Sequence, residues 1–519
     1  MHEVVIVGCG PTGLMLAAEL RLSGVDAVVL ERRASQALAG SRGGGVHSRT
    51  LELFDQRGIV NRFLAAGTTF AAATFGSTPL DLSALPTRHP YTLALFQNHV
   101  ERLLLEWVEE LGAPIRRGVE VTGVASHDDG VAVQLAGGGP LTAQFVVAAD
   151  GGRSAVRRAA GIELIGPDAT RSSLIAEVQA TEPLPPAAKV DARGIHGLHA
   201  MADGMVRVVV TEATLESAAE PTLADLQQAL NDVFGTDFGV HSPTWLSRFS
   251  DATRQAASYR SGRIFLAGDA AHVHSPTGGM GIGLGIQDAV NLGWKLGQVL
   301  RGESSQDLLD TYHAERHPAG ARALKFTMAQ SLFQKADPRQ EALRDLLDEA
   351  LRVERASVPA AALVTGLDVV YGVMTSDAAD TKEPATGHPL LGRRMPDVGV
   401  TTGGMTTVGI RPGGTTTGAT TAEGHTGKVY DLLHSARPVL LELGGPQLDV
   451  TGWTDRVQHV RATTTDPWNL PVIGDVAAPT AVLVRPDGYV AWVGLDSAEG
   501  LAEALGSWFG PPRRDEVAG

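Results

Sequence analysis

The chain has 519 residues, of which 43% are hydrophobic and 19% are charged, and its formal net charge is −15. This composition is typical of a soluble globular protein with sizeable cores, and the negative charge argues against nucleic acid or an anionic membrane surface as a partner. The single cysteine, Cys9, excludes an intrachain disulfide, and we recognise neither a signal peptide nor an apolar run of the roughly 20 residues that span a bilayer, so a cytoplasmic enzyme is expected.

The N-terminal segment predicts a strand–helix–strand unit. Residues 3–8 (EVVIVG) have the pattern of a buried strand, residues 13–24 have the apolar spacing of a helix, and residues 25–30 (VDAVVL) have the pattern of a second strand. The sequence GCGPTG lies between the first strand and the helix, whose N-terminus offers N–H groups and partial positive charge to phosphates. We interpret the unit as a dinucleotide site; the alternative is a glycine-rich turn of another α/β protein.

Each residue of this unit has a physical task. Gly8 permits the tight turn, Gly10 lets the backbone approach a pyrophosphate, and Gly13 lets the helix pack closely on the strand. Glu31, directly after the second strand, can accept hydrogen bonds from a ribose diol. The motif alone does not distinguish FAD from a nicotinamide dinucleotide.

Two later segments repeat the combination of a buried strand and an acidic residue. In 145–157 (FVVAADGGRSAVR) a strand leads into Asp150. In 263–295 (RIFLAGDAAHVHSPTGGMGIGLGIQDAVNLGWK) a strand delivers Asp269 at its C-terminal end, and a glycine-rich loop and a helix follow.

Together, the GxGxxG, DG and GD elements resemble the group A flavoprotein monooxygenases, the para-hydroxybenzoate hydroxylase-like enzymes. The resemblance is closest to actinomycete aromatic polyketide hydroxylases and extends through LLDTYHAERHP and VLVRPDGYVAW. It implies FAD, NADPH or NADH as reductant, O2, and hydroxylation of a phenolic, polycyclic polyketide-type substrate through a flavin C4a-hydroperoxide. Baeyer–Villiger oxygenation of a polyketide ketone is the alternative on the same scaffold. A non-catalytic flavin-binding module is a third.

The resemblance also implies which residues contact FAD. Thr12 and its neighbouring amides would bind the pyrophosphate, and Glu31 with Arg32 would bind the adenosine ribose. Val121, expected at the end of a strand, would pack near adenine. The N-terminal and middle segments would supply Gly8, Gly10, Pro11, Thr12, Gly13, Glu31, Arg32, Arg42, Gln97, Val121, Asp150 and Asp269.

The loop 276–283 would wrap the edge of the isoalloxazine. Its contacts would be Pro276, Gly279, Met280, Gly281 and Ile282, and Pro276 is the candidate for shaping the oxygen site. The polyketide hydroxylases usually read PTGGQGLN there, whereas this chain reads PTGGMGIG, so two side-chain amides are replaced and fine positioning of the flavin is affected. No metal site is expected, and no residue stands out as a catalytic base.

The predicted fold class is α/β, with a discontinuous Rossmann-like FAD-binding domain, a mostly antiparallel substrate domain and a thioredoxin-like C-terminal domain. The predicted boundaries are 1–70, 97–170 and 252–330 for the FAD-binding domain, 71–96 and 171–251 for the substrate domain, 331–387 for a helical connector, and 388–519 for the C-terminal domain.

The segment 399–427 is rich in Thr and Gly and has no apolar period. We expect a flexible loop or a disordered insertion there. The C-terminal domain around it contains no cysteine and therefore cannot carry out thiol chemistry. A packing role or a homodimer interface is expected for this domain instead.

Overall fold

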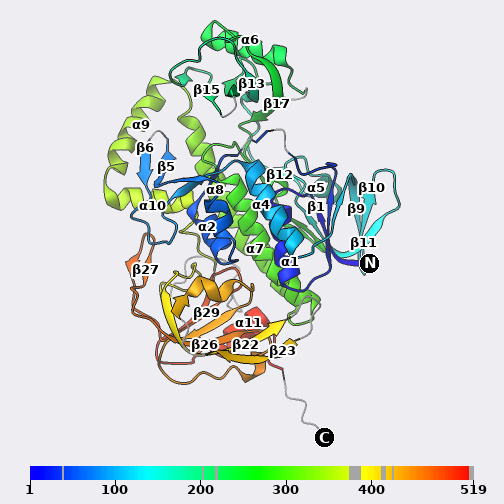
Figure 1. Cartoon of the computed structure of the whole chain (residues 1–519), viewed down its shortest axis with the longest axis vertical. Helices are drawn as coiled ribbons and strands as arrows, with labels where there is room; N and C mark the ends of the chain where they lie inside the picture. Colours follow the sequence, from blue (N-terminus) through cyan, green and yellow to red (C-terminus); the bar gives the residue numbers. More distant parts are fainter. Residues whose placement is uncertain are drawn as a thin grey trace.

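The computed structural model describes residues 1–513 except 38–39, 42, 77, 202–203, 217–219, 373–386, 411–415 and 423–425. The three largest sheets follow one another along the long axis of the molecule (Figure 1). A five-stranded sheet lies at one end, an eight-stranded sheet and the long helix α7 (Gly281–Leu300) lie in the middle, and a seven-stranded sheet lies at the other end. Among the described helices, none is long and apolar enough to cross a membrane.

The central sheet contains the strand path β19-β20-β11-β1-β2-β8. β1 pairs in parallel with β2 and β11, β11 pairs in parallel with β20, and the β9–β10 hairpin joins β11 in antiparallel fashion. Its inner strands are Val-rich because they are buried, as is usual in parallel sheets. The strand bounds are β1 (His2–Val7), β2 (Ala27–Glu31), β8 (Ile115–Arg117), β9 (Val121–His127), β10 (Gly130–Leu135), β11 (Leu141–Ala148), β19 (Arg260–Ser261) and β20 (Ile264–Leu266).

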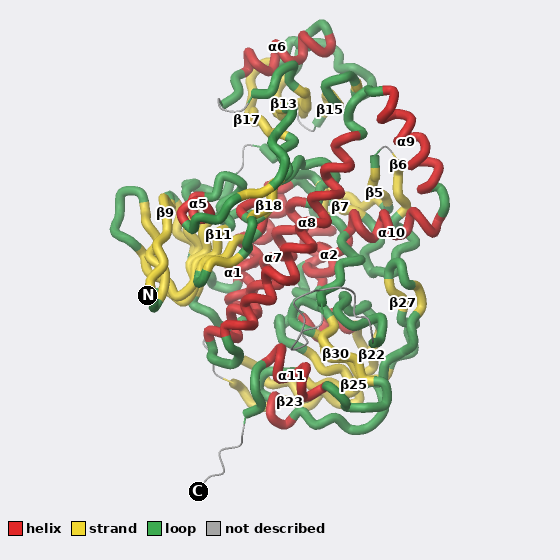
Figure 2. Tube along the Cα trace, turned by 180° about the vertical axis from the view of Figure 1, so that it is seen from behind, coloured by secondary structure: helices red, strands yellow, loops and turns green. Residues whose placement is uncertain are grey.

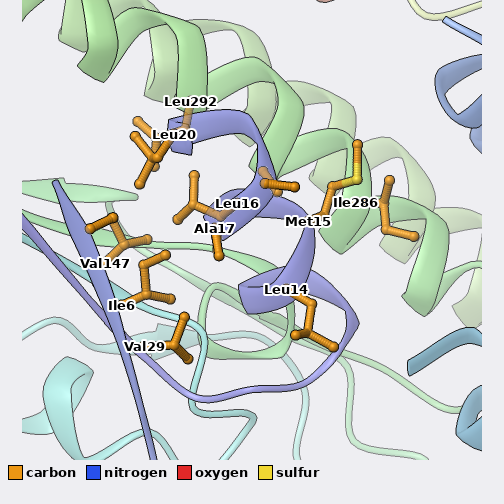
Figure 3. Close-up of a cluster of buried hydrophobic side chains, with 14 of the residues drawn as sticks. Ile6, Leu14, Met15, Leu16, Ala17, Leu20, Val29, Val147, Ile286 and Leu292 are labelled. Atoms are coloured by element: carbon orange, nitrogen blue, oxygen red, sulfur yellow. The ribbon is translucent and has the colours of Figure 1, made fainter. Parts of the chain in front are cut away.

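Helix α1 (Pro11–Leu22) lies between the central sheet and α7 (Figure 3). Leu16 of α1, Ile6 of β1 and Leu292 of α7 belong to one buried apolar cluster and are fully shielded from solvent. α1 is therefore apolar on two faces, and its position fixes the glycine-rich turn before it relative to α7. This packing connects the N-terminal motif to the segment that contains Asp269.

The five-stranded sheet is antiparallel, with the order β14-β15-β16-β13-β17. Helix α6 (Leu223–Phe234) covers one face, where Leu226 and Leu230 pack on the sheet. A mostly antiparallel sheet was expected for 171–251, and this is what forms. The strand bounds are β13 (Ser172–Gln179), β14 (Lys189–Val190), β15 (Ile195–Ala200), β16 (Val206–Thr211) and β17 (His241–Ser250).

Residues 71–96, assigned from the sequence to the substrate domain, do not pair with this sheet. β5 (Ala72–Phe75) and β6 (Thr78–Asp81) form their own hairpin, and β7 (Thr92–Ala94) pairs with β3 (Gly45–Val46) and β4 (Thr68–Phe70). The domain boundaries stay a prediction.

Three helices follow α7 along the chain, and the second and third lie in the segment 331–387 that the sequence predicted as a helical connector (Figure 2). They are α8 (Asp310–Leu332), α9 (Pro338–Leu351) and α10 (Glu354–Thr365). The other elements are α2 (Ser48–Asp55), α3 (Val60–Leu64), α4 (Gln97–Glu110), α5 (Ala155–Ala159), β12 (Leu164–Ile165), β18 (Arg254–Ala256), β21 (His272–Val273), β27 (Asn469–Leu470), β28 (Gly474–Asp475) and the 3-10 turns η2 (Gly268–Ala270), η3 (Gln306–Leu309), η4 (Val429–Leu433) and η5 (Thr451–Trp453).

The C-terminal sheet is mixed, with the path β23-β22-β26-β25-β29-β30 and β24 paired to β22. β25 and β26 are parallel, the neighbours on both sides are antiparallel, and Leu505 of α11 belongs to the core against the sheet. This agrees with the expected thioredoxin-like arrangement. The bounds are β22 (Gly399–Ile410), β23 (Thr416–Ala422), β24 (Thr426–Lys428), β25 (Val439–Glu442), β26 (Gln458–Thr463), β29 (Ala481–Val484), β30 (Val490–Gly494) and α11 (Leu501–Phe509).

The prediction of a loop or disorder across 399–427 is wrong for most of this segment. β22 pairs with β26, and β22 and β23 form a hairpin. Threonine is β-branched and suits a strand, and main-chain pairing needs no apolar alternation. Because the segment has few apolar residues and no alternation, the sequence pattern did not indicate these two strands.

Candidate functional site

The turn between β1 and α1 requires glycine at two of its positions. Gly8 has φ +107°, and a Cβ there would lie 2.3 Å from the carbonyl oxygen of Ala149. A Cβ on Gly13 would lie 2.0 Å from the carbonyl oxygen of Gly8. At Gly10 a Cβ would meet no described atom within 4 Å. The turn therefore packs tightly at Gly8 and Gly13 and is open at Gly10, as a pyrophosphate would need.

Helix α1 begins at Pro11 and has no acidic residue in its first turn, and no described side chain caps it. The N–H groups of Thr12 and Gly13 have no partner inside the helix, because the first turn lacks acceptors. Thr12 lies against two glycines: its Oγ1 would be 2.5 Å from a Cβ on Gly268 and 2.1 Å from one on Gly285. Thr12 thus joins the turn to the Asp269 segment and to α7.

Glu31 lies beside the turn and is buried. Its carboxylate accepts from the N–H groups of Cys9 and Arg33, each at 2.8 Å. Burial alone would raise the pKa of Glu31, but these two N–H groups and the Arg33 guanidinium outweigh it and hold the pKa below its ordinary value. Glu31 is therefore an ionised acceptor. Arg32, predicted beside the ribose, is exposed, and its neighbour Arg33 contacts Glu31 instead.

Sequence reasoning missed several polar residues around Glu31. Arg33 also contacts Glu101 at 3.3 Å, and Gln36 donates to Glu101 at 2.6 Å. Arg117, the last residue of β8, is paired in register with Glu31 and donates from Nη2 to Gln36 at 2.8 Å. Its Nη1 is buried and has no hydrogen-bond partner among the described residues. The sequence feature that could have identified Arg117 is the pair of arginines at the end of the strand in PIRRG.

These features fit a dinucleotide pyrophosphate. The N–H groups at the start of α1 and the positive end of the helix attract an anion, Gly10 leaves room for it, and Arg117 has a buried N–H group without an acceptor. FAD satisfies this donor set.

Two other predicted contacts, Gln97 and Val121, lie among the described residues, and a third, Arg42, lies outside them. Gln97 begins α4, where its N–H donates to Ser41 Oγ at 2.9 Å and its amide donates to Glu101 at 2.9 Å. Val121 is buried but begins β9 instead of ending a strand, because the chain turns directly before it. Arg42 is not among the described residues.

Asp150 follows β11 and lies beside the first turn of α5, whose N-cap residue is Ser154. Asp150 Oδ2 accepts from the N–H groups of Ala155 at 2.8 Å and Val156 at 3.3 Å, whereas Oδ1 is buried and has no partner among the described residues. Burial raises the pKa of Asp150. Asp269 lies in η2 and is exposed, and Gly268 before it donates its N–H to the buried Asp288 at 3.0 Å.

The loop before α7 is held by its own backbone and by His47. Gly278 and Gly279 have φ +82° and +67°, and the N–H of Gly279 donates to the carbonyl of Pro276 at 3.1 Å. His47 Nε2 lies 2.8 Å from the carbonyl oxygen of Gly278. Burial lowers the pKa of His47, so the neutral ring donates this hydrogen bond. Pro276 and Gly279 are thereby brought to the start of α7.

Helix α7 begins at Gly281 without a capping side chain among the described residues and without an acidic residue in its first turn. Its first N–H groups and its positive end therefore face the region that the loop encloses. A Cβ on Gly43 would lie 3.0 Å from Ile282 Cδ1, so the segment around Gly43 reaches the same place. Such an end stabilises negative charge, as a reduced flavin ring would carry.

Packing explains the two departures from the polyketide hydroxylase pattern. Met280 is buried in an apolar cluster with Leu284 and Phe326, where an amide would lack partners. A Cβ on Gly283 would lie 2.7 Å from Thr50 Oγ1, so Asn at this position would require Thr50 to shift. Both replacements suit the surroundings of α7 in this chain.

Comparison with known proteins now identifies the family. Residues 1–327 match the model described as "FAD binding domain", and residues 388–512 match "Aromatic-ring hydroxylase, C-terminal". The chain belongs to the FAD-binding family of flavoprotein monooxygenases. FAD is its cofactor, and NAD(P)H is the reductant of this class.

Several relatives match over nearly their whole length. The chain is 41% identical to a rifampicin monooxygenase of Streptomyces venezuelae, over 98% of this chain and 99% of the relative. It is 37% identical to a dialkyldecalin synthase of Streptomyces rugosporus, over 98% and 99%. Among solved structures, anhydrotetracycline hydroxylase of Streptomyces rimosus has a TM-score of 0.86 at 41% identity, with 99% of this chain and 100% of that chain covered. The resemblance inferred from the motifs is confirmed.

Proposed function

We propose that this protein hydroxylates a large phenolic, polycyclic molecule of polyketide type with O2 and NAD(P)H. The observation that carries the proposal is the meeting of the dinucleotide turn, the Asp269 segment and the uncapped start of α7 through Thr12. The names of the relatives that act on rifampicin and anhydrotetracycline support the substrate class.

Charged and polar groups of the chain would bind the pyrophosphate, the ribose and the ribityl region of FAD. The first turn of α1 and Arg117 would bind the pyrophosphate, Glu31 would accept from the adenosine ribose, and Asp269 would accept from the ribityl region. The N-terminal end of α7 would stabilise negative charge on the flavin ring. When bound, FAD supplies the redox chemistry and the activation of O2.

The substrate would lie between the loop 276–283 and the exposed face of the five-stranded sheet. Alternation along β16 turns Val208 toward α6 and Arg207 to the opposite face. Arg207 pairs with Glu177 at 3.0 Å, lies 4.8 Å from the Phe96 ring centre and reaches the carbonyl of Ser41. This face thus approaches the loop that precedes Gly43. A flat aromatic held there would exclude water from the reacting atoms, which favours oxygen transfer over loss of reduced oxygen to solvent.

The first experiment supplies holoprotein with NADPH, O2 and either anhydrotetracycline or rifampicin as probes. The proposal expects NADPH oxidation to accelerate with a phenolic polycyclic probe and the product to carry a new phenolic hydroxyl. A lactone or ester would assign Baeyer–Villiger oxygenation instead. Flavin binding without turnover of NADPH under any of these conditions would assign a non-catalytic flavin-binding module.

The dialkyldecalin synthase relative favours a second candidate. In that case the same scaffold would close a ring in a polyketide without net oxidation. The discriminating observation is product formation from a polyene probe without NADPH, O2 consumption or mass gain.

The proposal also covers the cellular location and the role of the C-terminal domain. The buried, single Cys9 and the use of NAD(P)H are compatible with a cytoplasmic location. The buried contacts between the C-terminal domain and α8, described below, support a packing role within the chain. A homodimer stays a prediction.

A further inference from the structure

The chain passes between the central part and the five-stranded sheet at two adjacent points. It enters β13 through Thr170 and Arg171 and returns from β17 through Asp251. Asp251 accepts from the N–H of Thr170 at 2.8 Å and from its hydroxyl at 2.6 Å, and it pairs with the Arg171 guanidinium at 3.3 Å. The two crossings are therefore fastened to each other, and we call these three residues the junction.

Arg171 extends from the junction to the end of α8. Its Nη2 donates to the carbonyl of Ser331 at 2.9 Å and to Oε1 of Gln334 at 3.1 Å. The Arg171 and Asp251 side chains are 11% and 14% exposed, so water screens this contact weakly. The end of α8 is thus fixed to the junction.

Gln334 continues the contact into the loop before α7. Its Nε2 donates to Thr277 Oγ1 at 2.8 Å, and Thr277 Oγ1 lies 2.8 Å from Ser275 Oγ. Arginine has no acceptor, so the Gln334 oxygen must face Arg171 and its NH2 group must face Thr277. The amide therefore has one orientation, with one end on the junction and the other on the loop.

Two sides of the molecule hold the same loop. His47 holds the carbonyl of Gly278 from the central part, and Gln334 holds the adjacent Thr277 from the junction. The loop is therefore connected to the central part through His47 and to the five-stranded sheet through Gln334 and Arg171.

We propose that Gln334 is a positioning residue that couples the junction to Thr277 and thereby sets how the start of α7 lies against the flavin ring. This inference rests on FAD binding as proposed above. Because the positive end of α7 stabilises the anionic reduced ring more than the neutral oxidised ring, the coupling is expressed in the reduction potential.

The test measures the midpoint potential of the bound flavin in holoprotein, with the FAD dissociation constant and the melting temperature recorded for every variant. The test variant is Gln334→Leu, which removes both hydrogen bonds. Gln228→Leu, on the exposed side of α6, is the matched control.

For Gln334→Leu we expect the ratio of reduced to oxidised FAD dissociation constants to rise about tenfold, which is a shift of about 30 mV to more negative potential for two electrons. Gln228→Leu should keep the wild-type potential. An unchanged potential in Gln334→Leu, or an equal shift in Gln228→Leu, would overturn the coupling.

A second pair keeps the test valid if Gln334→Leu does not fold. Thr277→Val removes the acceptor and should give the same shift, whereas Thr277→Ser should not. The double variant Gln334→Leu/Thr277→Val should shift no further than either single variant, because both variants remove the same contact between Gln334 and Thr277. Additive shifts would contradict the coupling. Wild-type protein that binds no FAD would contradict the proposed function itself, which is a different result.

Discussion

Arg485 of the C-terminal domain forms a buried ion pair with Glu315 of α8, with Nη2 and Oε2 2.9 Å apart. Lys295 of α7 donates to the same carboxylate oxygen at 2.7 Å, and Asp487 pairs with Arg485. Burial would raise the pKa of Glu315, but Arg485 and Lys295 outweigh it and lower the pKa to about 2. The Glu315 carboxylate therefore links the C-terminal domain to α7, the helix whose first turn lies at the candidate flavin site.

Removing one partner of this network should destabilise the protein strongly. Arg485→Met leaves Glu315 buried with less compensation, and the unfolding free energy should fall by about 3–5 kcal/mol. Arg62→Met, which breaks the exposed pair with Glu110, should cost about 1 kcal/mol or less. Urea denaturation at pH 7 measures both, and equal losses would show that the buried network has no special role.

Two glycines of the first turn should respond differently to alanine. Gly13→Ala places a Cβ against the Gly8 carbonyl and should reduce folding stability even without FAD. Gly10→Ala meets no described atom, so the apoprotein should melt as wild type, but the methyl group should obstruct the pyrophosphate and weaken FAD binding at least tenfold. Wild-type FAD affinity in Gly10→Ala would remove the pyrophosphate from this turn.

Arg117 should contribute to FAD affinity through its buried, unpartnered N–H group. Arg117→Met should weaken FAD binding by about 1.5–3 kcal/mol, the contribution of a hydrogen bond to a charged group. Its neighbour Arg116 is exposed, and Arg116→Met should bind FAD normally. Flavin fluorescence titration compares the two, and equal affinities would mean that Arg117 does not reach the cofactor.

The raised pKa of Asp397 predicts that the protein loses stability as the pH rises. Burial raises this pKa to about 6, and Asp55 adds to this, while the Tyr430 N–H, Arg88 and Lys428 act in the other direction. The folded state therefore holds a proton that the unfolded state loses near pH 4, so this group costs stability as pH rises from about 4 to 6.

Asp397→Asn keeps an acceptor for the Tyr430 N–H and removes the charge. The variant should match wild type at pH 4 and be about 3 kcal/mol more stable at pH 8. The difference in unfolding free energy across this range is the measurement. A variant that is less stable than wild type at pH 8 would show that the contact with Arg88 outweighs burial.

The sequence predicted the parts of the site that depend on one continuous segment. The turn of Gly8 and Gly13 and the helix after it follow from local pattern, and so does the strand that delivers Asp269. Arg33 and Arg117 were missed because their roles depend on the path after Glu31 and on the pairing of β8 with β2, which no local pattern contains. Val121 was placed at the wrong end of a strand because apolar residues occur at both ends.

The fold of 399–427 was concealed for a related reason. The hairpin of β22 and β23 forms through main-chain pairing with β26, which lies far along the chain. The Met280 and Gly283 replacements also make sense only beside α8 and Thr50, because the neighbours come from distant segments.

Incorporation of oxygen from ¹⁸O2 tests the central claim most directly. The holoprotein is given NADPH, a phenolic polycyclic probe that accelerates NADPH oxidation, and either ¹⁸O2 in ordinary water or ordinary O2 in H2¹⁸O. If the protein is a monooxygenase, the product formed with ¹⁸O2 carries one labelled oxygen atom in a new phenolic hydroxyl, and the product formed in H2¹⁸O carries none. A product without label from ¹⁸O2, or with label taken from water, would contradict the account.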